Sequence, residues 1–136
     1  MIKKRLKLLK ENLKKFGIDG YVVPKNDEFF SEYSSKDRLK IISNFDGSAG
    51  FAIILKNKNY LFVDGRYSIQ AEIQSGKNFK IVQYSKIRNC NLFKNIVLGI
   101  DSKIFTSSQI TNFFSKNNNK IKKIDINLID RISNKF

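Results

Sequence analysis

The sequence predicts an α/β fold, in which helices flank a mixed β-sheet in one three-layer-like domain. Short β-rich runs alternate with helix-like runs along the 136 residues, and no internal repeat is present. Hydrophobic residues make up 41% of the chain, 12 residues are phenylalanine and one is proline, so a packed core is expected. The stretch from Asn44 to Ala71 has the densest grouping of glycines, carboxylates and aromatic residues.

Apolar periodicity places the elements of the first half of the chain. In order, these are a helix at 2–16, a strand at 21–23, a helix at 36–43, strands at 51–55 and 60–63, and a helix at 68–75. The run 51–55 is almost continuously apolar, which suits a strand that is buried on both faces. Ser34 or Ser35 can cap the helix at 36–43, with Asp37 approximating a capping box. The turn before 68–75 leads into a helix, because Ile69 and Ile73 lie four residues apart.

The second half of the chain continues the alternation. We expect a strand at 79–84, an ambiguous segment at 89–95 that could be a short helix, a strand at 96–101, a helix at 107–115 and an exposed strand at 121–126. No clear element is expected from 127 to 136. The domain is therefore expected to occupy residues 1–130, and 131–136 to form a tail or the start of a linker to a following domain.

Residue counts exclude several kinds of chemistry. The sequence contains no histidine, which excludes a histidine-based catalytic triad and imidazole metal ligands. Cys90 is the single cysteine, so neither an internal disulfide nor a cysteine-rich zinc site can form. No apolar run approaches the roughly 20 residues needed to span a membrane, and no signal-peptide core follows the basic N-terminus. A cytoplasmic location is expected.

The formal charge of +14 is unevenly distributed. Residues 27–72 hold six Lys or Arg and seven Asp or Glu, a net of −1, and the excess lies mainly at 3–15 and 116–123. Solvated lysine-rich faces are the favoured interpretation. Nucleic acid or an anionic membrane surface remains an alternative partner, and binding of that kind would weaken steeply with salt.

The loop Gly47-Ser48-Ala49-Gly50 could suggest phosphate or nucleophile chemistry. A strand follows it, whereas a phosphate loop precedes a helix whose N-terminus supplies backbone amides. Ser48 has no histidine to activate it. A metal site built from nearby carboxylates is disfavoured without histidine, the candidates being Asp27, Glu28, Glu32, Asp46 and Asp64.

Arg66 is the candidate cation of this stretch. It could pair with Glu32, Asp37 or Asp64 in a structural network, which is the favoured interpretation. Alternatively, its fork could bind a ligand carboxylate.

Several motifs together resemble a known family. They are Ser31-Glu32-Tyr33, Asp37-Arg38, Ile42 to Gly50, and Asp64-Gly65-Arg66-Tyr67 with Gln70-Ala71, supported by Tyr21 to Pro24, Gly99-Ile100-Asp101 and Asn127 to Asp130. In order and spacing the chain resembles the creatinase/prolidase N-terminal domain of Xaa-Pro aminopeptidase (aminopeptidase P), in its longer three-domain form. It departs from that family at Asn44, where glycine is usual, and at Val63, where threonine is common. After Asp130 it lacks the family's tryptophan and Arg-Pro pair.

The resemblance implies that catalysis belongs to a separate C-terminal domain. That domain binds two divalent metals, often manganese, and hydrolyses the bond before a proline at the second position of a peptide. The resemblance assigns no catalytic or metal residue to this chain, which is expected to help form a homodimer and one wall of the substrate site. The wall candidates are Phe45, Asp46, Gly47, Ser48 and Arg66, and the structural motif comprises Glu32, Tyr33, Asp37, Arg38, Gly50, Asp64, Gly65, Tyr67 and Gln70.

A non-catalytic aminopeptidase domain is thus the favoured function. Its partners would be a second copy or the family's own catalytic domain. The alternative is a stand-alone or remnant module that binds a peptide or protein. A basic nucleic-acid-binding protein is the less favoured third hypothesis.

Overall fold

The computed structural model describes residues 2–24, 38–47, 50–83, 95–101 and 119–133. Within them, one six-stranded sheet has the order β4-β3-β2-β1-β5-β6. Its strands are β1 (Gly20–Pro24), β2 (Phe51–Leu55), β3 (Asn59–Val63), β4 (Lys80–Gln83), β5 (Val97–Ile100) and β6 (Lys120–Lys123). The helices are α1 (Ile2–Lys15), α2 (Arg38–Ser43), α3 (Ser68–Ser75) and α5 (Leu128–Ser133), with a 3-10 helix, η1, at Gly65–Tyr67.

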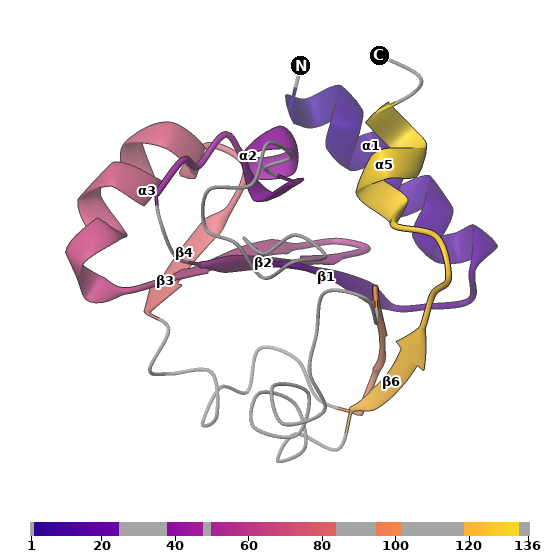
Figure 1. Ribbon diagram of the computed structural model, residues 1–136. Coiled ribbons are helices and arrows are strands. Elements are labelled where there is room, and N and C mark those ends of the chain that lie inside the picture. Colours follow the sequence, from indigo (N-terminus) through magenta and orange to yellow (C-terminus); the bar gives the residue numbers. More distant parts are fainter. Residues whose placement is uncertain (1, 25–37, 48–49, 84–94, 102–118, 134–136) are drawn as a thin grey trace.

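The sheet is mixed, as the sequence predicts. Strands β1, β2 and β3 are antiparallel neighbours, whereas β4, β5 and β6 each run parallel to the strand beside them. Figure 1 shows the four described helices over one face of the sheet. The ambiguous segment at 89–95 (apart from Asn95) and the predicted helix at 107–115 lie outside the described residues.

Strand β2 divides the core into two parts. Ala52 and Ile54 pack into the cluster beneath the helices, and Phe51 and Ile53 pack into the cluster on the opposite face. All four side chains are buried, because successive residues of a strand point to opposite faces. The predicted burial of this strand on both faces is confirmed.

Helix α1 ends as its sequence predicts. Leu6, Leu9 and Leu13 are buried on one side of the helix. Gly17 has φ +68°, and the amide of Ile18 donates to the carbonyl of Leu13 at 3.0 Å. This is a Schellman ending, in which glycine takes the left-handed conformation without a Cβ clash.

Helix α5 corrects the prediction that no element follows residue 126. The side-chain oxygen of Asn127 accepts from the amides of Ile129 at 3.0 Å and Asp130 at 3.4 Å, which caps the helix. Leu128, Ile129 and Ile132 are completely buried in the cluster beneath the helices. The helix runs through the domain boundary expected at residue 130.

Strand β6 is shorter than the predicted strand at 121–126. The strand ends at Lys123. The amide of the next residue, Ile124, still donates to the carbonyl of Ile100 at 2.8 Å. The Ile124 side chain is buried. Ile124 lies in the alternating run at 121–126 that predicted an exposed strand, but its side chain belongs to the core.

Candidate functional site

The loop after α2 begins with a left-handed residue. Asn44 has φ +67°, a conformation that asparagine tolerates better than most side chains. Its Nδ2 donates to the Gln74 carbonyl at 3.4 Å. This geometry accounts for asparagine at a position where the resembled family usually carries glycine.

Phe45 anchors this loop from beneath. Its side chain is completely buried, and its ring meets the Tyr67 ring edge-on, with centroids 6.2 Å apart. A Cβ on Gly47 would overlap the Phe45 ring, so only glycine fits there without a shift. Phe45 and Gly47 therefore shape the loop and present no side chain to a ligand.

Asp46 ties the loop to helix α3. Its Oδ1 accepts from Gln70 Nε2 at 2.6 Å and from Gln74 Nε2 at 2.9 Å, and its amide donates to Gln74 Oε1 at 3.2 Å. Ser75 Oγ adds a buried bond to the Ser43 carbonyl at 2.7 Å. Asp46, Gln70 and Gln74 thus form an exposed clamp between the loop and α3. Gln70 is part of the predicted structural motif.

Asp64 and Arg66 form a compact unit at the start of η1. Asp64 Oδ1 accepts from the Arg66 amide at 3.0 Å and from Arg66 Nε at 3.3 Å. The backbone bond, aided by the side-chain bond and the positive charge, holds the pKa of Asp64 below its ordinary value. The Arg66 guanidinium lies 5.6 Å from the Tyr67 ring centroid, and its side chain is 77% exposed. Of the partners expected for Arg66, the structure shows Asp64, and the other two lie outside the described residues.

Arg38 belongs to the interior. Its side chain is 1% exposed, and Nε and Nη2 contact the two carboxylate oxygens of Asp130 at 3.0 and 2.9 Å. Arg38 is part of the predicted structural motif, but its partner, 92 residues away, is not predicted from the sequence. The sequence held a signal for helix α5 but not for the pair: Asn127 is a typical helix cap, and Asp130 follows it in the first turn.

The two motif glycines differ in what they require. Gly50 has φ +151°, and a Cβ there would lie 2.9 Å from the Phe62 carbonyl oxygen. A Cβ on Gly65 would meet nothing within 4 Å. The remaining predicted site residues lie outside the described residues: Glu32, Tyr33, Asp37 and Ser48.

The described site offers charge and hydrogen bonds at a surface. Asp46 is exposed on the loop, and Arg66 is exposed on η1. Within the described ranges, no group of three or more His, Cys, Asp or Glu side chains is placed to hold a metal ion. Nor does any helix in those ranges have the length and apolar character needed to cross a membrane.

Comparison with known proteins identifies the family. Residues 5–131 match the model of the Creatinase/Prolidase N-terminal domain. A probable Xaa-Pro aminopeptidase P of Laccaria bicolor is 36% identical over an alignment covering 93% of the chain, and Xaa-Pro aminopeptidase 1 of Dictyostelium discoideum is 34% identical over 99%. The chain spans only 22% and 24% of the length of these two relatives.

Solved structures share the fold. The X-prolyl aminopeptidase of Caenorhabditis elegans, a cytosolic enzyme with a di-nuclear active site, covers 96% of the chain with a TM-score of 0.81 at 21% identity. The match covers 25% of that enzyme. The N-terminal domain of the cytoplasmic peptidase PepQ from Mycobacterium tuberculosis H37Rv covers 95% of the chain with a TM-score of 0.72 at 18% identity, and 98% of that domain is matched. These findings confirm the resemblance in the sequence: the chain belongs to the creatinase/prolidase N-terminal domain family, as found in Xaa-Pro aminopeptidases.

Proposed function

We propose that this chain serves as the non-catalytic N-terminal domain of a metal-dependent Xaa-Pro aminopeptidase and forms one wall of its substrate site. The observation that carries the proposal is the division of roles within residues 44–71. Phe45 and Gly47 fix the loop from inside, while Asp46 and Arg66 remain at the surface. The names of the relatives support Xaa-Pro peptides as the substrate.

The metal chemistry is assigned to a separate catalytic domain. The di-nuclear active site of the C. elegans enzyme supports two divalent metals, for which we propose manganese. No residue of this chain is assigned as a ligand, and its sequence contains no histidine. The cytosolic location of the C. elegans enzyme supports a cytoplasmic location for this chain.

Arg66 is the proposed contact to substrate. Its guanidinium contacts Asp64 and lies near the Tyr67 ring, and its side chain is 77% exposed. The planar fork of arginine suits a peptide carboxylate. Ser48 in the adjoining loop remains a wall candidate from the sequence alone.

Helix α3 supplies the proposed dimer contact. Ile69 and Ile73 lie one turn apart on this helix and are 78% and 81% exposed. Large apolar side chains at such exposure favour a protein contact. If they form the dimer interface, I69D/I73D should shift the chain from dimer to monomer in sedimentation equilibrium, whereas Glu72→Gln on the same helix should not. A wild-type chain that is monomeric at high concentration would contradict this part of the proposal.

A chimera tests the substrate wall. This chain replaces the matching N-terminal part of the C. elegans enzyme, and kcat and KM are measured with an Xaa-Pro peptide. Arg66→Ala should raise KM several-fold with kcat little changed, because it removes a proposed binding contact and no catalytic group. Lys77→Ala, an exposed lysine beyond α3, is the matched control. Equal kinetics for the two variants in a folded, active chimera would contradict the assignment.

A further inference from the structure

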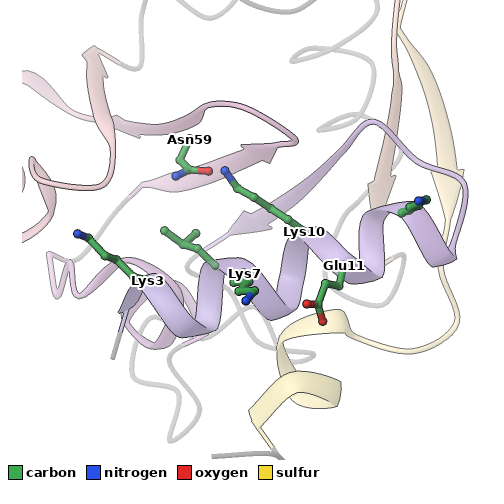
Figure 2. A pocket seen from close by; sticks show the side chains of 7 residues that line it. Lys3, Lys7, Lys10, Glu11 and Asn59 are labelled. Carbon is green, nitrogen blue, oxygen red and sulfur yellow. The ribbon is translucent and has the colours of Figure 1, made fainter.

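A second surface lies on α1, away from the site described above. A shallow groove of about 540 Å³ follows this helix and reaches the start of β3. Figure 2 shows the side chains that line it. The lining consists of Lys3, Leu6, Lys7, Lys10, Glu11, Lys14 and Asn59. The four lysines recur at spacings of four, three and four residues, so they follow one side of the helix over about 16 Å.

Among the described residues, the lysines of this groove outnumber the carboxylates and form no ion pair. Glu11 is the single carboxylate in the lining, and the ion pairs of the described residues include neither Glu11 nor any of these lysines. Lys10 is half-buried, and burial lowers the pKa of its ammonium group. A carboxylate that bound here would replace the hydration that Lys10 has lost.

The groove also contains a hydrogen-bond acceptor. Asn59 Nδ2 donates to the Asn78 carbonyl at 2.9 Å, but its buried Oδ1 has no donor among the described residues. Figure 2 shows the Lys10 ammonium group pointing toward this amide. A ligand with both carboxylates and N–H donors therefore matches the lining better than an anion without donors.

Two other anionic partners fit less well. Sites for single-stranded nucleic acid combine positive charge with aromatic stacking surfaces, and the described residues of this lining include neither an aromatic residue nor an arginine. A helix that lies in a membrane surface inserts its apolar face into the lipid. The apolar face of α1 is unavailable, because Leu9 and Leu13 are completely buried in the core.

We propose that the lysine groove binds an extended acidic peptide segment of a partner protein. In an extended chain, every second side chain points to the same face, about 6.6 Å from the last. Lysines three and four residues apart on a helix are separated by about 4.5 and 6 Å along its axis. Three carboxylates of such a segment thus fall opposite the row of lysines, and its backbone supplies an N–H donor for Asn59 Oδ1.

The test is fluorescence anisotropy at low salt with a labelled ten-residue peptide rich in Asp and Glu. The variant K3Q/K7Q/K10Q/K14Q should bind at least about tenfold more weakly than the wild type, because the four positive charges that face the three carboxylates are removed. The control K77Q/K80Q/K120Q/K123Q removes the same charge from exposed lysines outside the groove and should weaken binding less than about threefold. Circular dichroism confirms that both variants are folded.

Several results would overturn the proposal. One is absence of peptide binding by the wild type, and another is equal weakening in the two variants, which would indicate a general effect of net charge. Tighter binding of a single-stranded RNA of matched charge, or of phosphatidylserine vesicles, with the same dependence on these four lysines would assign the groove to that partner instead. Loss confined to the groove variant, with the acidic peptide as the tightest ligand, supports it.

Discussion

Two clamps hold distant parts of this chain together, one at the surface and one in the interior. At the surface, Asp46 accepts hydrogen bonds from Gln70 and Gln74 and fastens the loop to α3. In the interior, Arg38 on α2 contacts Asp130 on α5 through two parallel bonds. In each clamp a carboxylate accepts hydrogen bonds from side chains. Only in the inner clamp is the donor, Arg38, buried.

The difference shows how burial sets the cost of losing a partner. Water can replace a lost partner at the exposed clamp, so each bond there is worth about 0.5–1.5 kcal/mol. Arg38 is 1% exposed, and its charge would stay desolvated if Asp130 were lost. Breaking a fully buried pair typically costs about 3–5 kcal/mol, and we expect the lower end of that range here because the Asp130 side chain is 30% exposed.

The largest expected effect comes from Asp130→Asn. It should lower the free energy of unfolding by about 3 kcal/mol, measured by urea denaturation, because a neutral amide compensates the buried guanidinium poorly. Asp125→Asn changes an exposed carboxylate two residues before the cap and should have little effect. Similar losses of unfolding free energy in both variants would show that Asp130 contributes no more to stability than an exposed carboxylate does. Replacing both partners with apolar residues, R38M/D130L, should recover part of the loss.

A smaller effect is expected from Gly47→Ala, which tests whether the buried Phe45 ring shapes the loop that carries Asp46. The new methyl group would overlap the buried Phe45 ring and should cost about 1–3 kcal/mol in thermal or urea unfolding. Gly65→Ala is the matched control, because nothing lies within 4 Å of its Cβ position. It should leave stability unchanged or raise it by up to about 1 kcal/mol. Equal destabilisation of the two variants would refute the anchoring role of Phe45.

Gln74→Ala tests the outer clamp itself. The substitution removes the bonds at 2.9 and 3.2 Å to Asp46 and should cost about 1 kcal/mol. Hydrogen exchange of the Asp46 amide should accelerate, because that amide loses its acceptor. Glu72→Gln on the same helix is the control, and unchanged exchange in Gln74→Ala would contradict the clamp.

The smallest effect concerns the pH dependence of Asp64. Its pKa is lower in the folded state than in the unfolded chain, so its contribution to stability is present above the unfolded-state pKa and is lost as the pH falls through the folded-state value. Arg66→Gln removes the side-chain bond and the charge but keeps the backbone amide, which is the larger cause. The pKa of Asp64, followed by carboxyl-carbon NMR, should therefore rise in this variant but stay below its ordinary value. Complete restoration of the ordinary value would show that the backbone bond is not the main cause.

The sequence predicts the parts of the fold in which periodicity is strong. The three- and four-residue spacing of leucines defines α1, and the continuous apolar run at 51–55 defines a strand buried on both faces. The C-terminal helix was missed because its apolar residues, Leu128, Ile129 and Ile132, fill less than two turns. One cap residue, Asn127, decides its start.

The candidate site was predicted as a region but not in its geometry. The motif from Asn44 to Ala71 identifies the family, yet a loop has no periodicity to show that Phe45 points inward and Asp46 outward. The pair between Arg38 and Asp130 spans 92 residues. Only the tertiary fold brings such residues together, so local sequence patterns could not reveal it.

Catalysis by this chain alone is the most direct test of the central claim, that the domain supplies architecture and a binding surface without the chemistry. The purified 136-residue chain is incubated with an Xaa-Pro peptide and manganese, and release of the N-terminal residue is followed by chromatography. We predict no release above a control without protein. Release that increases in proportion to the concentration of the chain would contradict the account.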